Sequence, residues 1–212
     1  MYLFSRRARL APGNTRAAMT WATEITEKAN QITDLTVSAF TSAFSPELGT
    51  VVWSTFAPDL ASLEASNDKL LADDGYVVMI DEGSRLIQPN LDDALLQIAY
   101  GGVDPNRRVE YGTSVQAVCA SGSVTRGLEL GVEIAERAET ITGVPSLFAT
   151  GVTGPYGAVT WFSGFADIAE MERAQQALAA DASFTRFIDD NVRGVYAEDF
   201  AFTRQLIYRR LV

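Results

Sequence analysis

The sequence predicts an α+β protein built from two tandem βαββαβ repeats, and three observations carry this prediction. Tyr2–Phe56 aligns without a gap with Tyr111–Phe165. After one deletion near Pro58 the alignment continues, so that LLADDGYVVMIDE at Leu70–Glu82 matches LAADASFTRFIDD at Leu178–Asp190. Both copies also show the same order of strand and helix patterns. Similar residues in one register, interrupted by a single gap, indicate an internal duplication.

The helices are predicted from capping residues and from apolar stripes at helical spacing. Asn14 and Ser123 occupy equivalent positions after a glycine-containing turn, and both are favourable N-caps. Apolar residues then follow on one helical face in each copy: Trp21, Ile25, Ala29 and Ile32, and Leu130, Ile134, Ala138 and Ile141. Pro58 stands in the first turn of a second helix, where proline is tolerated. The predicted helices are Asn14–Ile32, Pro58–Asp73, Ser123–Ile141 and Asp167–Ala180.

Segments rich in β-branched and aromatic residues predict four strands in each repeat. The predicted strands are Tyr2–Leu10, Leu35–Phe44, Thr50–Phe56 and Asp92–Tyr100, then Val109–Cys119, Ser146–Val152, Gly157–Phe165 and Asp199–Tyr208. Leu70–Glu82 is then the end of the second helix and the segment that leads to the last strand. The predicted domains are residues 1–100 and 107–212, joined by a Gly- and Pro-containing linker at 101–106.

Composition and charge restrict the partners and the cellular location. The formal net charge is −10 and the pI is about 4.5, which opposes binding to nucleic acid. No apolar run approaches the roughly 18 residues that span a bilayer, and the first residues do not resemble a signal peptide. Cys119 is the only cysteine, so an intramolecular disulfide is excluded. We expect a cytoplasmic protein with no membrane insertion and no nucleic-acid partner.

The chain contains no histidine, and this absence excludes several kinds of catalytic site. Histidine is the usual general base near neutral pH, the commonest metal ligand and a frequent haem ligand. A Ser-His-Asp triad, a Cys-His dyad and a histidine-ligated metal or haem site are therefore impossible within one chain. With a single cysteine, a zinc site built from cysteines is excluded as well. No cofactor is expected.

Two ferredoxin-like βαββαβ units with long first helices and a hairpin between the second and third strands resemble the dimeric α+β barrel superfamily. The resemblance implies two four-stranded antiparallel sheets that pack into one barrel, formed here within one chain as a pseudo-dimer. Relatives include NIPSNAP-type proteins, antibiotic-biosynthesis monooxygenase-type proteins and haem proteins of the chlorite dismutase and dye-decolourising peroxidase type. The haem branch is excluded because this sequence has no proximal histidine. The resemblance supplies no catalytic residue, because it rests on topology rather than on a motif.

Strand alternation sorts the side chains that would line the lumen of such a barrel. In the last strands Leu96, Tyr100 and Tyr208 are expected on the side of the helices, which leaves two glutamines at equivalent positions on the lumen side. In the first strands the more polar alternation is expected to face the lumen, and Arg7 and Arg9 would provide fixed charge and bidentate donors. The candidate ligand-binding residues are Arg7, Arg9, Gln97, Ser114, Gln116 and Gln205. The alternative is that these groups lie at an exposed rim or pair with acidic neighbours.

Other conspicuous residues have structural explanations that compete with functional ones. Trp53 and Trp161 could line a pocket, but large aromatic side chains in strands more often belong to the core. Cys119 ends a strand and is expected to be a buried small hydrophobe rather than a nucleophile. The acidic pairs lack the spacing of a metal site and are expected to form a solvated surface.

Two functions of different classes fit these observations. The first is a protein that binds a small polar or anionic ligand in the lumen, either as a binder or as a cofactor-independent enzyme of the oxygenase or isomerase type. The second is a structural protein whose barrel is filled by side chains and whose outer surfaces assemble. Homo-oligomers are compatible with both.

Overall fold

The computed structural model describes residues 1–104, 106–199 and 203–212. The chain forms two compact units, and their boundaries do not coincide with the sequence repeat. Unit 1 comprises Met1–Leu95 and Tyr208–Val212, and unit 2 comprises Leu96–Ile207. Of the linker predicted at 101–106, Pro105 lies outside the described residues, and Gly101–Asp104 has no regular structure.

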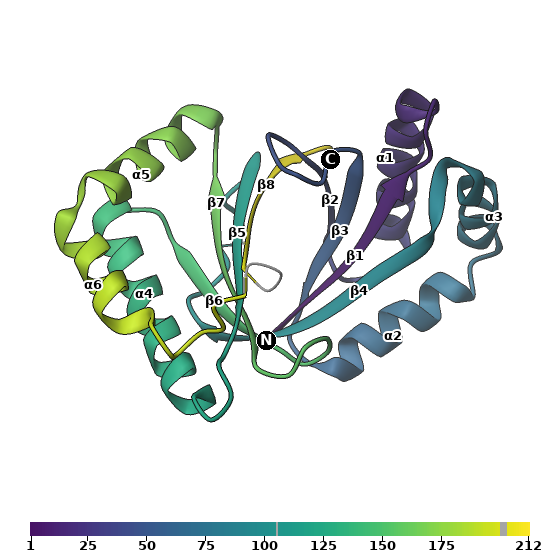
Figure 1. Cartoon of the computed structure of the whole chain (residues 1–212). Helices are drawn as coiled ribbons and strands as arrows, with labels where there is room; N and C mark the ends of the chain where they lie inside the picture. Colours follow the sequence, from purple (N-terminus) through teal and green to yellow (C-terminus); the bar gives the residue numbers. More distant parts are fainter. Residues whose placement is uncertain (105, 200–202) are drawn as a thin grey trace. The chain divides into compact units, whose positions relative to one another are not determined.

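Unit 1 places its helices on one face of an antiparallel sheet (Figure 1). Its strands are β1 (Tyr2–Leu10), β2 (Val37–Ser42), β3 (Thr50–Ala57) and the first part of β4 (Ile87–Tyr100), and its helices are α1 (Thr15–Ile32), α2 (Leu60–Leu71), α3 (Asp74–Gly83) and the short 3-10 helix η1 (Ser84–Leu86). The central strand β3 pairs with β1 and with β2. The predicted strands and first helix of this repeat are confirmed, except that β2 is shorter and β4 is longer than predicted.

Unit 2 repeats this arrangement (Figure 1). Its strands are β5 (Tyr111–Val118), β6 (Ser146–Gly151), β7 (Ala158–Phe165) and the first part of β8 (Arg204–Arg210), and its helices are α4 (Val124–Thr142), α5 (Ile168–Ala180) and α6 (Ala182–Val192). The central strand β7 pairs with β5 and β6. Residues 200–202 of the strand predicted at 199–208 lie outside the described residues, and β8 itself begins only at Arg204.

The last strand of each repeat explains why the compact units differ from the sequence repeat. Leu96–Tyr100 of β4 pairs with β6 and belongs to unit 2. Tyr208–Arg210 of β8 pairs with β2 and belongs to unit 1. The hydrogen-bonded strand order β1-β3-β2-β8-β5-β7-β6-β4 closes on itself as an eight-stranded barrel. The predicted fold class of a mixed α+β barrel with antiparallel strands is confirmed.

Each repeat contains a third helix that the sequence reading took for a connecting segment. The first of these helices begins after Asp73, whose carboxylate accepts a hydrogen bond from the Tyr76 amide at 2.8 Å. Its counterpart begins after Asp181, whose carboxylate accepts from the Ser183 and Phe184 amides. The prediction was wrong because each helix is only about three turns long and directly follows another helix. The acidic residues are N-caps that start a new helix rather than the end of the old one.

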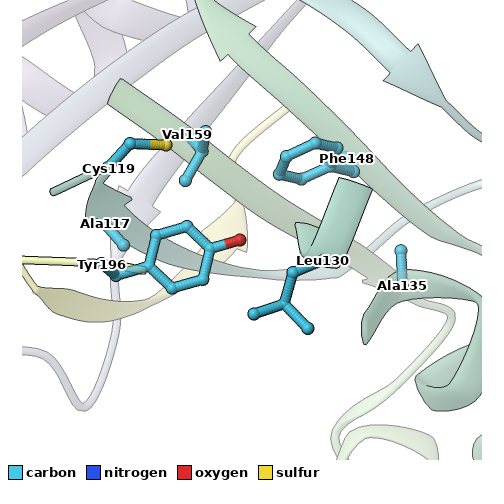
Figure 2. Packing of buried hydrophobic residues seen from close by; sticks show 7 residues of the cluster. All are labelled: Ala117, Cys119, Leu130, Ala135, Phe148, Val159 and Tyr196. Carbon is cyan, nitrogen blue, oxygen red and sulfur yellow. The ribbon is translucent and has the colours of Figure 1, made fainter. Parts of the chain in front are cut away.

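A buried cluster between sheet and helices forms the core of unit 2 (Figure 2). It comprises Ala117, Cys119, Leu130, Ala135, Phe148, Val159 and Tyr196. Phe148 and Leu130 are fully buried, and the Trp161 ring lies against Phe148 and Tyr196. A smaller cluster in unit 1 joins Leu10 and Val51 to Ala18 and Ala22 of α1. These clusters identify the side of each sheet that packs against helices, which we call the helix face.

No helix among the described residues combines the length and the apolar character that crossing a bilayer requires.

Candidate functional site

The opposite side of each sheet, which we call the distal face, carries the polar residues of the first strands. In β1, Ala8 and Leu10 pack on the helix face of unit 1, so the alternating residues Arg7 and Arg9 lie on its distal face. In β5, Ala117 packs on the helix face of unit 2. Ser114 and Gln116 therefore lie on the distal face of unit 2. The structure thus distributes these four candidates over two units, two in each.

Arg7 contacts side chains from three other segments of unit 1. Its guanidinium Nη1 lies 3.2 Å from Glu47 Oε2, in the turn between β2 and β3, and 4.0 Å from Asp92 in β4. Its Nη2 donates to the Tyr208 hydroxyl of β8 at 3.4 Å. The Glu47 side chain is only 13% exposed, whereas that of Asp92 is 78% exposed. The contact with Glu47 therefore dominates, because an exposed ion pair contributes little.

A row of paired residues crosses the distal face of unit 1 from one arginine to another. Arg7 pairs with Val52, Val52 with Phe40, and Phe40 with Arg210. The Arg210 guanidinium lies 5.8 Å from the centre of the Phe40 ring and donates to the Ser38 hydroxyl at 3.1 Å. Since neighbouring strands are about 4.8 Å apart, the two arginine backbones are about 14 Å apart. An apolar strip of Val52 and Phe40 thus separates two guanidinium-bearing residues.

A buried hydroxyl without a hydrogen-bond partner lies in the next row of the same face. Thr50 pairs with Arg9, is fully buried, and its Oγ1 has no partner among the described residues. Leaving such a group unsatisfied costs about 1–3 kcal/mol, so native proteins usually supply a partner. The neighbouring Ser42 hydroxyl is satisfied, since it donates to the Glu47 carbonyl at 2.5 Å. Thr50 is therefore a buried polar group of this face that the described residues leave without a partner.

In unit 2 a buried hydroxyl also lacks a hydrogen-bond partner, but β5 carries no arginine beside it. Ser114 is 2% exposed and its Oγ has no hydrogen-bond partner among the described residues. It pairs across the sheet with Phe162, and Gln116 pairs with Thr160. Gln116 stands where the first repeat has Arg7. The duplicated strands thus present arginines in unit 1 and only neutral polar groups in unit 2.

The structure places Gln97 and Gln205 on the helix face, opposite to the face predicted for them. Gln97 pairs with Thr150, which pairs in turn with Val159 of the unit 2 core, and both glutamines are exposed. Gln205 lies two residues before Ile207 on β8 and therefore on the same face. Ile207 packs against the cluster that includes Met171 and Ala174 of α5. For Gln97, a register shift between Ile98 and Tyr100 explains the error, because the β-bulge puts Tyr100 and Ile98 on opposite faces. For Gln205, the error arises because Leu206 is buried on the distal face rather than on the helix face.

The competing structural explanations hold for both tryptophans and for the cysteine. Trp53 Nε1 donates to Thr26 at 3.0 Å and Trp161 Nε1 donates to the Gly131 carbonyl at 2.8 Å, so both rings belong to the helix face. Cys119 is buried, and burial raises the pKa of its thiol. A thiol with a raised pKa stays protonated at neutral pH, which fits a packing role.

Four residues of the distal face were missed by sequence reasoning. Glu47 lies in a turn, and Thr50 looks like an ordinary strand residue. Tyr208 was expected on the helix face, and Arg210 follows the strand end that was predicted. The pairing of β8 with β2 brings the last two into unit 1. Local sequence carries no signal for a strand pairing between residues so far apart, although the repeat aligns Tyr208 with Tyr100.

Comparison with known proteins shows the fold and no more than the fold. No family model and no curated protein matches the chain. Among solved structures, the chain is similar to a protein from Fusobacterium nucleatum provisionally named a monooxygenase, with a TM-score of 0.73 and 12% identity over 100% of this chain and 92% of that chain. A second provisional monooxygenase, from Lactobacillus acidophilus, gives a TM-score of 0.68 and 7% identity over 100% of this chain and 94% of that chain.

A third similar structure is an anthrone oxidase-like protein, with a TM-score of 0.68 and 10% identity over 99% of this chain and 90% of that chain. These matches confirm the fold that the resemblance implied. At such identities no residue role transfers from these proteins to this chain.

Proposed function

We propose that the protein binds a small molecule with an anionic group and a compact apolar body on the distal face of unit 1. The observation that carries this proposal is the buried, unpartnered Thr50 hydroxyl on the face that carries Arg7 and Arg9. Fold relatives named as monooxygenases and as an anthrone oxidase-like protein are consistent with small-molecule chemistry on this scaffold. Binding without catalysis and cofactor-independent catalysis would both use this site.

The charges on this face favour an anion despite the acidic neighbours. Arg7 is largely balanced by Glu47, and Arg210 supplies a second guanidinium at the other end of the row. Arg9 lies on the same face, and no ion pair to it occurs among the residues that the structure describes. Three guanidinium groups thus share the face with two carboxylates. Arginine binds a carboxylate through paired donors, which gives an anionic ligand both energy and orientation.

The apolar strip determines what the rest of the ligand resembles. Val52 and Phe40 lie between the two arginines of the row. A ligand body that covers them gains from the burial of apolar surface, at roughly 25 cal/mol per Å². The unpartnered Thr50 hydroxyl and the Tyr208 hydroxyl offer hydrogen bonds beside this strip. A compact organic acid satisfies these features together.

Benzoate tests this proposal, with benzylamine and benzyl alcohol as cationic and neutral analogues. We expect benzoate to bind best at low ionic strength and more weakly as salt screens the arginines. Arg9→Ala should weaken binding about ten-fold, which corresponds to about 1.4 kcal/mol. Calorimetric titration or ligand-observed NMR measures the dissociation constants. Equal benzoate affinity in wild type, Arg7→Ala and Arg9→Ala would remove the proposed site.

Two matched controls separate this site from general surface electrostatics. Arg16→Ala removes an exposed arginine of α1, in a separate open groove of about 650 Å³, and should leave benzoate affinity unchanged. Gln97→Ala should also have no effect, since Gln97 lies on the helix face. A protein that binds none of the three probes and self-associates at micromolar concentration would favour the structural alternative.

Glu47→Gln provides a test in the opposite direction. The carboxylate of Glu47 occupies part of the Arg7 guanidinium and repels an incoming anion. Its neutral amide should therefore tighten benzoate binding about three-fold or more. Weaker binding in this variant would mean that Glu47 serves the ligand directly, contrary to the proposed charge preference.

A further inference from the structure

We propose that unit 2 has a second, chemically different site on its own distal face, which binds a small uncharged molecule through the Ser114 hydroxyl. This site goes beyond the proposed function, because it lies in the other unit and selects against the anions that Arg7, Arg9 and Arg210 attract in unit 1. Three properties of the strands β5, β6 and β7 support this site: a buried hydroxyl, open space on the same face, and the absence of charged side chains on these three strands.

The buried hydroxyl is Ser114 Oγ. The residue is 2% exposed, and no donor or acceptor among the described residues reaches its oxygen. Its counterpart in the first repeat, Ser5, is only partly buried and is not unsatisfied in this way. A hydroxyl that has lost its water and gained no protein partner is stabilised by a group that enters from outside the chain.

Space for such a group exists beside Ser114. Gly112 lies two residues earlier on β5, and therefore on the same face of the sheet. A Cβ atom placed on Gly112 would meet nothing within 4 Å. The backbone there is not in the left-handed region, so the conformation does not require glycine. The absent side chain leaves room two residues away from the unpartnered hydroxyl, on the same face of the sheet.

The composition of the strands determines the chemical class of the occupant. β5, β6 and β7 contain no Asp, Glu, Lys or Arg, whereas β1 alone contains three arginines. The other neighbour of β5 is β8, whose Arg204 belongs to unit 2; this arginine is exposed and has an interaction partner of its own. A charged group placed beside Ser114 would be desolvated without a counter-ion on these strands, which is strongly unfavourable. Phe162 and Leu147 continue the row that starts at Ser114 and provide an apolar wall. The occupant is thus uncharged and largely apolar, with one group that hydrogen-bonds to a hydroxyl.

Benzyl alcohol, benzoate and benzylamine serve as probes of the full-length protein, measured by ligand-observed NMR with matched variants. We expect wild type to bind benzyl alcohol at this site. Ser114→Ala removes the hydrogen-bonding group, and Gly112→Val fills the adjacent space, so each should weaken benzyl alcohol binding at least ten-fold. Ser5→Ala, the equivalent change in the first repeat, should leave it unchanged. Benzoate affinity should not respond to Ser114→Ala.

A stability measurement tests the unpartnered hydroxyl itself. Without ligand, Ser114→Ala should raise Tm by about 2–4 °C, since it removes a buried polar group that has no partner. Ser5→Ala should leave Tm unchanged. The proposal is overturned if no uncharged probe binds, or if Ser114→Ala binds benzyl alcohol as wild type does. It is also overturned if Ser114→Ala is less stable than wild type, because the hydroxyl would then be satisfied within the protein.

The two proposals fail independently. Loss of benzoate binding in Arg9→Ala together with unchanged benzyl alcohol binding in Ser114→Ala would support the unit 1 site and overturn this one. The reverse pattern would overturn the unit 1 site and leave the uncharged site standing.

Discussion

Gly131 and Phe148 in unit 2 occupy the positions that two alanines, Ala22 and Ala39, hold in unit 1. All four residues are buried. A Cβ atom on Gly131 would lie 2.1 Å from the Phe148 ring, which explains why the helix has no side chain at that position. The two repeats thus fill equivalent positions differently: unit 2 has a glycine and a phenylalanine, whereas unit 1 has two alanines.

Gly131→Ala should destabilise the protein by about 1–3 kcal/mol or more, because the new methyl group overlaps a ring that cannot move away in a filled core. Urea denaturation measures the change. The matched variant Ala22→Gly, which introduces the glycine of one repeat into the other, should cost about 2 kcal/mol, about 1 through helix propensity and about 1 through the loss of a buried methyl group. A Gly131→Ala protein as stable as wild type would show that the Phe148 ring has room to shift.

At the scale of elements, the third helix of each repeat depends on a single aspartate cap. Hydrogen bonds from Lys28 and then from the Tyr76 amide hold the pKa of Asp73 below its usual value. The Ser183 side chain and the Phe184 amide do the same for the pKa of Asp181. Both carboxylates therefore stabilise the folded state when they are charged.

This arrangement predicts a definite pH dependence. Since the folded pKa values are lowered, the stabilisation is fully present above the unfolded value near pH 4 and is lost as the pH falls through the folded values. Asp73→Ala should therefore unfold at lower temperature than wild type at pH 7, and the difference should shrink below about pH 4. Asp73→Asn retains a capping side chain and should lie between the two. A difference that is constant from pH 7 to pH 2 would contradict the role of the charged cap.

The sequence allowed most of the elements to be predicted, but not all of their consequences. The duplication and the alternation of apolar residues specify strands and long helices, because both depend on short-range periodicity. The third helices were missed because a short helix directly after another one lacks an independent pattern. Gln97 was assigned to the wrong face because a bulge at Ile98–Tyr100 changes the alternation without any local sign.

At the scale of the whole molecule, each compact unit needs the end of a strand from the other repeat. Tyr208–Arg210 pairs with β2 in unit 1, and Leu96–Tyr100 pairs with β6 in unit 2. These exchanges also complete the proposed site, since Tyr208 and Arg210 lie on the distal face of unit 1. Arg7 and Arg9 could be proposed from strand alternation alone. Their partners could not, because they depend on a pairing between distant parts of the chain.

A chain that ends at Ile207 should lose the edge of the unit 1 sheet. The amides of β2 should then exchange with solvent faster, because Leu211 donates to Ala39 and β8 pairs along Phe40–Ser42. Protection in β6 of unit 2 should stay close to that of the full chain. Hydrogen exchange followed by NMR measures both. Unchanged protection of β2 would contradict the assignment of Tyr208–Val212 to unit 1.

The most direct test of the account is a chemical-shift titration of the ¹⁵N-labelled protein with benzoate. Saturable shifts should concentrate on β1, β2, β3 and the end of β8, around Arg7, Arg9 and Thr50. In Arg9→Ala they should need about ten-fold more benzoate to reach the same extent. Shifts that are absent, that do not saturate, or that persist unchanged in Arg9→Ala would contradict the proposal that unit 1 binds a small anion on its distal face.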